Sequence, residues 1–346
     1  MNRSVRTKLT TLGLCVTLMF TALTGCGNKD TKENLSTEQQ SVTEVIESTE
    51  NVTEAGNEVT EGASEENPVT FTDALGRDVT VTSHDRVAAM IGSFADVWLL
   101  SGGELVATAN DSWESLDLDL GDDVVNLGSI QEPNTEALLA AQPDLVIAST
   151  NTTSNVEMEN MLTEAGVTVA YFDVSDFDAY LQMLDICTDI TGRKDLYEKN
   201  GLEVQKLIEE IKARVDDSHP SVLFLRAAAS GVKAKGSEGS VGGELLKDLG
   251  CVNIADSDSG LLDNLSLEAI VTADPDYIFV TTQGTDTDAA LENVQETLIN
   301  SPVWSSLTAV KENHYYVLDK RLYNLKPNAR WGEAYKELAD ILYQEN

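Results

Sequence analysis

The chain has 346 residues, with 59 Asp and Glu against 23 Lys and Arg, and its formal net charge is -36. A negative charge of this size argues against a nucleic-acid partner, because phosphates are bound through Lys and Arg. The length is sufficient for two lobes of domain size.

Residues 1–25 have the pattern of a secretory signal. Basic residues at positions 3, 6 and 8 precede an uncharged stretch, 9–25, which is too short for a comfortable membrane span. The signal ends in Leu-Thr-Gly before Cys26, which resembles the lipobox of bacterial lipoproteins. The resemblance implies that Cys26 is lipidated and becomes the mature N-terminus. The alternative is an ordinary cleaved signal that happens to contain a cysteine.

Residues 26–67 are rich in Glu, Thr, Ser and Asn and show no sustained periodicity. Low hydrophobicity and high negative charge cannot offset the entropy of ordering, so this segment is predicted to be a disordered acidic tether. The folded part should begin near Pro68. There, residues 69–81 form two alternating runs around a turn and predict a β-hairpin.

Strands and helices alternate through residues 68–190, which are predicted to form an N-terminal lobe. Strands are expected at 86–91, 105–109, 145–148 and 167–172, and helices at 94–101, 134–140, 156–165 and 177–190. Ser93 is the expected N-cap of the first helix. This alternation predicts a parallel sheet that helices cover on both faces.

One long amphipathic helix is predicted at 195–215, within a linking segment 191–219. Its apolar residues recur at spacings of three and four. Gly201 would weaken the helix by about 1 kcal/mol relative to alanine. The helix should end before Pro220, because proline and the turn-forming residues that precede it cannot continue a helix.

Residues 220–346 repeat the scheme and are predicted to form a C-terminal lobe. Strands are expected at 221–226, 252–254, 277–280 and 315–318, helices at 244–249, 266–272, 289–300 and 331–343, and a loop at 227–243. Residues 134–150 match 266–282 in Glu, Ala, Pro and Asp at equivalent positions. Each copy predicts a helix, a Pro-Asp turn and a buried strand, so the α/β fold should consist of two similar lobes with parallel-rich sheets, joined by the linking helix.

In open α/β sheets, ligands lie outside the carboxyl ends of the strands, so the two lobes should face a shared cleft. The basic and aromatic residues of the loops that would meet there are Trp113, Arg226, Lys233, Lys235, Tyr323 and Arg330. In an acidic protein they would suit a ligand with carboxylate or catecholate groups. The alternative is that the two arginines are structural ion-pair partners and the aromatic residues belong to the core.

The glycine-rich segment 236–246 could present backbone N–H groups to an anion at a helix N-terminus, or could be a flexible loop at the cleft. The histidines, His84, His219 and His314, are not expected to converge, which argues against a bound metal. No Ser-His-Asp or Cys-His set is apparent, so no enzymatic activity is expected.

Two cysteines, Cys187 and Cys251, lie in the predicted folded part. A single pair drawn from different lobes is weak evidence for a disulfide, and buried free thiols are the favoured interpretation.

Glu136 and Glu268 each lie two residues after an expected helix-capping residue, Asn134 or Ser266. A carboxylate in the first turn stabilises a helix by a few tenths to about 1 kcal/mol. That structural role is sufficient by itself, but it does not explain why both copies of the repeat carry the glutamate.

Together, the lipobox, the segment TDALGRDVTV, the paired Glu-x6-Pro-Asp segments and the linking helix resemble the ferric-siderophore and cobalamin receptors of ABC importers. The resemblance is clearest over residues 86–346. It implies a substrate-binding protein with no cofactor, whose ligand is an iron chelate, haem or a cobamide. In that family one surface glutamate per lobe contacts the permease, which assigns this role to Glu136 and Glu268. The cleft residues are assigned to the ligand by location only.

The resemblance further implies a monomer anchored by lipid to the extracytoplasmic face of the cell membrane. It would act with an ABC permease and, through the permease, with an ATPase. The alternatives are a receptor for a bare transition metal and a chelatase-like enzyme on a similar two-lobe scaffold. Metal binding without a chelator would favour the first, and turnover of a ligand would favour the second.

Overall fold

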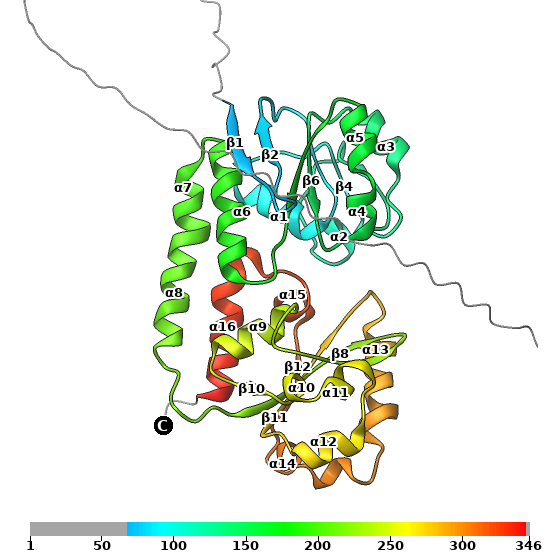
Figure 1. Cartoon of the computed structure of the whole chain (residues 1–346), viewed down its shortest axis with the longest axis vertical. Coiled ribbons are helices and arrows are strands. Elements are labelled where there is room, and N and C mark those ends of the chain that lie inside the picture. The colour runs from blue at the N-terminus through cyan, green and yellow to red at the C-terminus, as the bar shows by residue number, and fades with distance from the viewer. Residues whose placement is uncertain (1–67, 344–346) are drawn as a thin grey trace, which may run out of the picture. The chain divides into compact units, whose positions relative to one another are not determined.

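The computed structural model describes residues 68–343, which contain two five-stranded sheets and a separate two-stranded hairpin (Figure 1). The signal segment, Cys26 and the acidic tether lie outside the described residues. The hairpin consists of β1 (Val69–Thr72) and β2 (Asp78–Val81), which pair antiparallel as the alternating pattern predicts. Ala74 in its turn donates a backbone hydrogen bond to the carbonyl of Tyr171, so the hairpin docks on the N-terminal lobe.

The sheet of the N-terminal lobe is entirely parallel, with the order β5-β4-β3-β6-β7. Its strands are β3 (Val87–Ala89), β4 (Ala107–Thr108), β5 (Val125–Asn126), β6 (Leu145–Ser149) and β7 (Thr168–Phe172). Its helices are α1 (Gly92–Leu100), α2 (Asp111–Glu114), α3 (Thr135–Ala140), α4 (Thr153–Glu157), α5 (Glu159–Glu164) and α6 (Phe177–Ile190). Alternate residues of β3 belong to two different hydrophobic clusters, one on each face of the sheet. Val87 and Ala89 pack with α1 and α6, whereas Ala88 packs with α3 and α5.

Two local predictions in this lobe were wrong. The single helix expected at 156–165 is divided into α4 and α5. Ser93 is not the N-cap of α1; that position belongs to Ile91, which has no side-chain cap. The Asp111 carboxylate instead accepts the first N–H of α1, from Gly92, at 2.9 and 3.0 Å. It can approach so closely because a Cβ at Gly92 would lie 2.9 Å from that carboxylate.

The linking helix is confirmed as one helical run made of α7 (Lys194–Tyr197), the π-helical turn η1 (Glu198–Leu202) and α8 (Glu203–Lys212). The π turn was not predicted. At this turn the Tyr180 hydroxyl of α6 donates to the carbonyl of Asn200 at 2.8 Å, and the Asn200 side chain donates to the carbonyl of Leu100 at 2.8 Å. A Cβ on Gly201 would lie 2.7 Å from Leu181, so the glycine allows α6 to approach closely.

In the sheet of the C-terminal lobe, strands β10-β8-β11-β12 are parallel, and β9 pairs antiparallel with β8. The strands are β8 (Ser221–Ala228), β9 (Gly231–Lys235), β10 (Val252–Asn253), β11 (Tyr277–Thr282) and β12 (Tyr315–Leu318). The first helices are α9 (Val241–Asp248), α10 (Ile254–Ser257), α11 (Ser259–Asp263), α12 (Leu267–Ala273), α13 (Thr287–Val294) and η2 (Gln295–Ile299). They are followed by η3 (Trp304–Ser306), α14 (Thr308–Lys311), α15 (Lys320–Tyr323), η4 (Asn328–Arg330) and α16 (Trp331–Leu342).

Strand β9 corrects the prediction of a loop at 227–243, so Lys233 and Lys235 lie on a strand. Only Ala234 among its residues is buried, so the strand offers little of the apolar alternation by which strands are recognised. Helix α9 also begins three residues earlier than predicted, at Val241.

The internal repeat is confirmed. Helix α3 precedes β6 as α12 precedes β11, and the Pro-Asp turn has the same structural role in both copies. Asp144 accepts hydrogen bonds from the Ser83 hydroxyl and from the backbone N–H of Asp85 and Arg86, just before β3. Asp276 accepts from the hydroxyl and backbone N–H of Ser221, the first residue of β8. Each aspartate therefore fixes the start of the central strand beside it.

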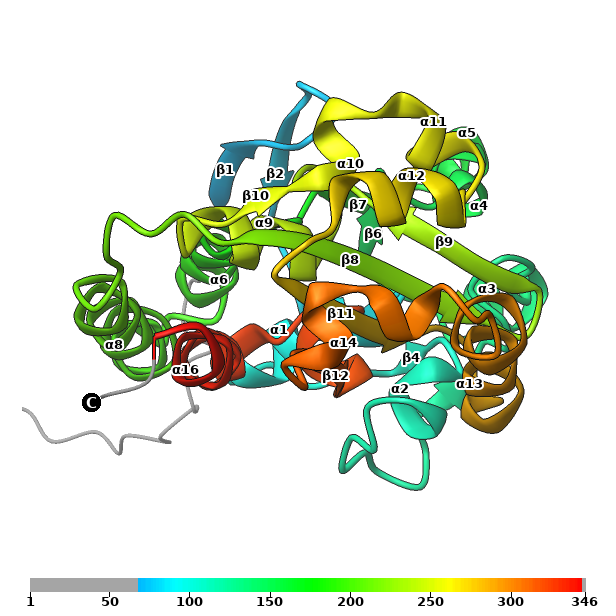
Figure 2. The ribbon, with the colours of Figure 1, turned by 90° about the horizontal axis from the view of Figure 1, so that it is seen from below.

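The two lobes share part of their hydrophobic core. Helix α16 lies beside α8 in both views (Figures 1 and 2). Trp331 at the start of α16 packs edge-on against Phe177 of α6, with ring centroids 6.3 Å apart. Asn328 donates to the Ser93 carbonyl and to the Asp96 carboxylate of α1, both at 2.8 Å. The predicted lobe boundaries stay predictions, because one core cluster contains residues of both lobes.

Candidate functional site

A cavity of about 480 Å³ lies between the lobes, where the strands of both sheets end. The N-terminal lobe contributes Asn151 after β6 and residues 173–175 after β7. The C-terminal lobe contributes Phe224 and Arg226 of β8, Lys235 of β9, the segment 239–241, and Tyr323, Asn324 and Lys326. This is the position that the rule for open α/β sheets predicts for a ligand.

Arg226 and Lys235 in the lining, and Lys233 beside them outside it, are cations without an ion-pair partner among the described residues. Arg226 lies opposite Lys233 in the β8–β9 ladder, and Phe224 lies opposite Lys235, so the three cations extend from one face of the sheet. Within residues 68–343, no ion pair or hydrogen bond neutralises the side chains of Arg226, Lys233 or Lys235. Burial lowers the pKa of Arg226. Burial, followed by the charges of Arg226 and Lys233, also lowers the pKa of Lys235.

Besides Arg226 and Lys235, the lining contains a third cation, Lys326. Its ammonium lies 5.5 Å from the ring centroid of Phe94 in α1, so this residue reaches the N-terminal lobe. Burial lowers its pKa, and the carboxylates of Asp173 and Asp111 partly offset that effect. Lys326 was not among the residues predicted to contact the ligand. The available signal was its position in the chain, between Tyr323 and Arg330, which were both expected at the cleft.

The start of α9 forms one wall of the cavity. Ser240 is the N-cap, and its hydroxyl donates to the Gly236 carbonyl at 3.1 Å instead of capping the helix. A Cβ on Gly242 would lie 2.2 Å from the Phe224 ring, so glycine is required for this approach. The glycine-rich segment therefore becomes partly helical, and the residues that line the cavity belong to the first turn of α9 and to the loop before it.

The structure places the other predicted ligand residues differently. Tyr323 lines the cavity, but it is buried and its hydroxyl donates to the carbonyl of Ala334 and to Glu337. Arg330 forms a two-point ion pair with Glu333, at 2.6 and 2.7 Å, beside a separate cavity of about 200 Å³. The alternative of a structural ion pair therefore describes Arg330 but not Arg226. Trp113 is half-buried on α2 and does not line the cavity.

The family model described as periplasmic binding protein matches residues 87–322. The chain belongs to the periplasmic binding protein family. Among curated relatives, the iron-uptake system-binding protein of Bacillus subtilis is 24% identical, over 80% of this chain and 85% of the relative. The Fe(3+)-citrate-binding protein YfmC of Bacillus subtilis is 25% identical, over 72% of this chain and 77% of the relative. Both relatives are binding proteins by name.

Solved structures of similar fold include two from Staphylococcus aureus. SirA complexed with staphyloferrin B has a TM-score of 0.62 and 22% identity, covering 80% of this chain and 97% of that chain. IsdE complexed with heme has a TM-score of 0.60 and 19% identity, and the match covers 75% of this chain and 99% of the IsdE chain. These likenesses confirm the predicted fold class, two α/β lobes with a helical connection.

Glu136 and Glu268 of this periplasmic binding protein are both exposed, on α3 and α12. The expected caps are confirmed. The Asn134 side chain accepts from the N–H of Ala137 at 3.0 Å, and the Ser266 hydroxyl accepts from the N–H of Ala269 at 3.3 Å. Neither glutamate forms an ion pair with another described residue, so both carboxylates are free for a partner.

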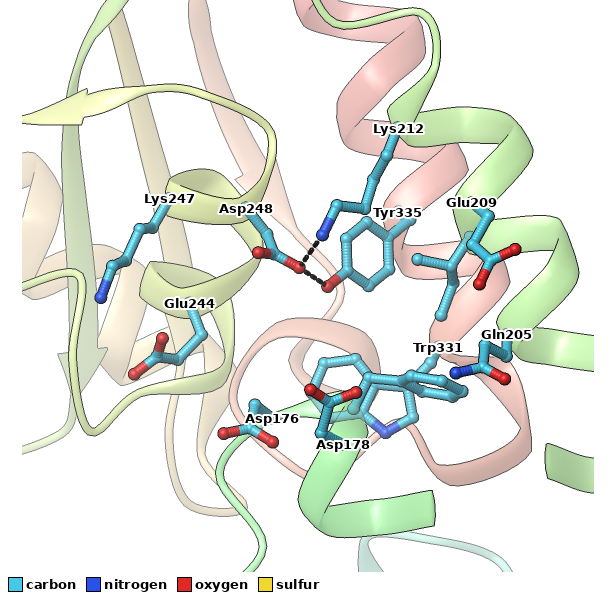
Figure 3. Close-up of a pocket in the computed structure, with 12 residues that line it drawn as sticks. Asp176, Asp178, Gln205, Glu209, Lys212, Glu244, Lys247, Asp248, Trp331 and Tyr335 are labelled. Atoms are coloured by element: carbon cyan, nitrogen blue, oxygen red, sulfur yellow. Dashed lines mark hydrogen bonds and ion pairs between the residues drawn. The ribbon is translucent and has the colours of Figure 1, made fainter. Parts of the chain in front are cut away.

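A second cavity of about 480 Å³ lies among α6, α8, α9 and α16 (Figure 3). Carboxylates dominate its rim, and Asp248 is bound there by the Lys212 ammonium at 2.9 Å and the Tyr335 hydroxyl at 2.5 Å. Its aromatic floor belongs to the shared hydrophobic core. None of the residues that line this cavity of the binding protein belongs to a strand, and we interpret it as part of the junction between the lobes.

Within residues 68–343, no group of three or more His, Cys, Asp or Glu side chains has an arrangement that could hold a metal ion. His219 contacts the carbonyl of Gly250, and His314 stacks on Tyr277 at 4.3 Å. Cys187 and Cys251 are buried free thiols, as expected, and burial raises the pKa of each to about 12. Among the helices described, none combines the length and hydropathy that a membrane span requires.

Proposed function

We propose that this periplasmic binding protein is the extracytoplasmic receptor of an ABC importer and captures an iron complex between its lobes. The observation that carries the proposal is the cavity at the carboxyl ends of both sheets, with unpaired cations on its wall. The names of the curated relatives, which include an iron-uptake and a ferric citrate-binding protein, support iron as the cargo. The protein itself would bind and release the complex without changing it.

The test is a tryptophan-fluorescence titration of the purified full-length protein in detergent. The ligands are ferric citrate, a ferric catecholate, a ferric hydroxamate, haem, cobinamide and free metal ions. Saturable quenching by an iron complex, with no response to free Fe³⁺, is expected. A response to free metal alone would favour the bare-metal receptor, and turnover of a bound ligand would favour the chelatase-like enzyme.

We further propose that Glu136 and Glu268 dock the receptor on arginines of the permease. Both are exposed at equivalent positions of the two lobes, and neither lines the ligand cavity. Replacing both by arginine should abolish uptake by cells and leave the affinity for the iron complex intact, because only the permease contact is reversed. Loss of affinity would instead place these residues in the ligand site, and unchanged uptake would contradict a docking role.

Finally, we propose that Cys26 carries the lipid that anchors the receptor to the extracytoplasmic face of the membrane. Two acyl chains give stable anchoring where one gives only marginal binding. Mass spectrometry of the mature N-terminus should detect a diacylglyceryl group on Cys26, and Cys26→Ala should release the protein from the membrane. An unmodified mature N-terminus would refute the anchor.

A further inference from the structure

We infer that the ligand is a polyanionic ferric chelate whose own donor atoms complete the coordination of the iron, and that haem is not the ligand. The inference rests on the proposed function and narrows the ligand class of the same cavity. Two independent features carry it: the surplus of positive charge on the cavity wall, and the lack of a side chain there that could bind the iron.

The charge of the lining is unbalanced. Arg226, Lys235 and Lys326 are its cations and Asp173 is its carboxylate, which leaves two positive charges in a protein whose formal net charge is -36. The Asp173 carboxylate accepts a hydrogen bond from the Asn151 side chain at 2.5 Å and forms no ion pair with another described residue. Like charges held together in a partly buried cavity raise the free energy of the empty protein, and a bound anion would relieve that cost.

The spacing of the cations indicates more than one anionic group. Lys233 and Lys235 extend from the same face of β9, which places their Cα atoms about 7 Å apart at the usual rise of a strand. Arg226 and Lys235 also line another cavity, of about 820 Å³, to which Lys233 contributes. The carboxylates in its lining are Glu238, which pairs with Lys247, and Asp256. An anionic arm that leaves the cavity between the lobes would therefore meet a further cation along the strand.

The same lining offers the iron no suitable axial ligand. Haem iron in proteins is held by His, Cys, Met or Tyr. The described residues that line the cavity include no His, Cys or Met. The one tyrosine, Tyr323, is buried and its hydroxyl donates to Ala334 and Glu337. A chelate that surrounds its iron completely needs no such residue.

The test compares ferric citrate, the cationic trihydroxamate chelate ferrioxamine B and haemin on the full-length protein. Ferric citrate should bind at least about 100-fold more tightly than ferrioxamine B. Arg226→Gln and Lys235→Gln should each weaken ferric citrate by about 30-fold or more, as expected for loss of a partly buried charge partner. The control Lys336→Gln removes an exposed lysine in the middle of α16, which pairs with Asp340 and does not line the cavity, and it should leave the affinity unchanged.

A second readout examines the iron directly. The electron paramagnetic resonance spectrum of the ferric chelate should be unchanged on binding, and the gallium(III) complex should bind within about threefold of the ferric one. A new ligand field, haemin binding with a shifted Soret band, or equal affinity for ferrioxamine B would overturn the inference and leave the receptor function standing. If none of the iron complexes binds, the proposed function itself fails.

Discussion

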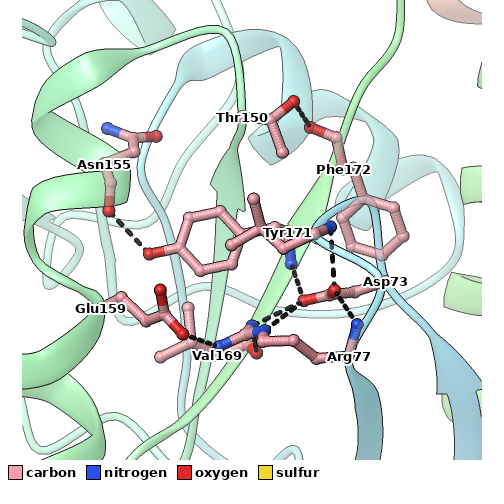
Figure 4. Close-up of polar contacts among 9 residues, drawn as sticks. Asp73, Arg77, Thr150, Asn155, Glu159, Val169, Tyr171 and Phe172 are labelled. Carbon is pink, nitrogen blue, oxygen red and sulfur yellow. Dashed lines mark hydrogen bonds and ion pairs between the residues drawn. The ribbon is translucent and has the colours of Figure 1, made fainter. Parts of the chain in front are cut away.

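At the scale of single residues, Arg77 holds the N-terminal hairpin to the lobe beneath it (Figure 4). Its guanidinium donates to the Asp73 carboxylate at 2.5 and 3.0 Å, to Glu159 at 2.7 Å and to the carbonyl of Val169 at 2.9 Å. It also lies over the ring of Tyr171, 4.9 Å from the centroid. The Asp73 side chain is fully buried, and among the described residues Arg77 is the cation that pairs with it, while backbone N–H groups of residues 75, 77 and 171 donate to the same carboxylate.

Arg77→Ala should therefore lower the free energy of unfolding by about 3 kcal/mol, the cost of leaving a buried carboxylate without its partner. Arg77→Lys should lose less, because a lysine keeps the charge but not the multiple hydrogen bonds. Denaturant unfolding followed by circular dichroism measures both values. As a control, Lys336→Ala breaks an exposed ion pair and should have a much smaller effect. Equal losses in Arg77→Ala and Lys336→Ala would show that the network contributes little.

The same pair predicts a pH dependence. Burial alone would raise the pKa of the Asp73 carboxyl, but hydrogen bonds and charge from Arg77 lower it below its ordinary value. The stability that Asp73 contributes is thus present above its pKa in the unfolded chain and is lost as the pH falls through its lower pKa in the folded protein. Arg77→Ala removes the side-chain hydrogen bonds and the charge but keeps the backbone N–H bonds from residues 75 and 77, so this benefit shrinks and the acid unfolding transition should move to higher pH. An unchanged transition would contradict the argument.

Ligand binding should also depend on pH, through the two lysines that line the cavity. Burial lowers the pKa of both Lys235 and Lys326. The charges of Arg226 and Lys233 lower the pKa of Lys235 further, whereas the carboxylates of Asp173 and Asp111 partly offset the effect of burial on Lys326. A polyanion prefers both ammonium groups charged, so binding raises these pKa values and is accompanied by proton uptake. Affinity for ferric citrate should be full below the lowered pKa values and fall as the pH rises through them. Calorimetry in buffers of different ionisation enthalpy measures the uptake, and proton release would refute it.

At the scale of elements, the linking helix shows what a sequence pattern can and cannot predict. The recurrence of apolar residues predicted the helix, because its period depends on the chain alone. The π turn depends on contacts with other elements, through Tyr180 and Asn200, and no local pattern encodes these. Strand β9 was missed for a related reason. It is an edge strand in which lysines occupy the positions next to its one buried residue, so periodicity gives little signal.

Gly201 provides a test of this distinction. Helix propensity alone predicts that Gly201→Ala stabilises the protein by about 1 kcal/mol. The structure predicts that Gly201→Ala destabilises the protein instead, because the new Cβ would lie 2.7 Å from Leu181 and 3.3 Å from Leu184 of α6. Overpacking of this kind costs about 1–3 kcal/mol. Thermal and denaturant unfolding show whether Gly201→Ala stabilises or destabilises the protein. Lys206→Ala is the control, because Lys206 is exposed on the same helical run and its replacement changes helix propensity without changing packing.

At the scale of the whole molecule, the repeat and the alternation of strands and helices predicted both lobes and the cleft between them. They also placed Arg226 and Lys235 at that cleft, because the carboxyl ends of parallel strands meet there. Lys326 escaped prediction, since its place depends on how the segment before α16 crosses to Phe94. Arg330 was assigned to the ligand although Glu333 follows three residues later, at a spacing suited to an ion pair. Charge alone could not separate a partnered arginine from a free one.

The connection between the lobes predicts how the receptor responds to its ligand. The linking helix, α16 and the Asn328 contacts join the lobes through a shared core, so closure requires repacking of helices and not only a change in loop dihedrals. Small-angle scattering should therefore show no change in the radius of gyration when ferric citrate binds. Asn328→Gly keeps the left-handed backbone at φ 54° and removes the side chain that contacts Ser93 and Asp96. That variant should be wider when empty and contract on binding, whereas a large closure of the unmodified protein would show that the connection is a hinge.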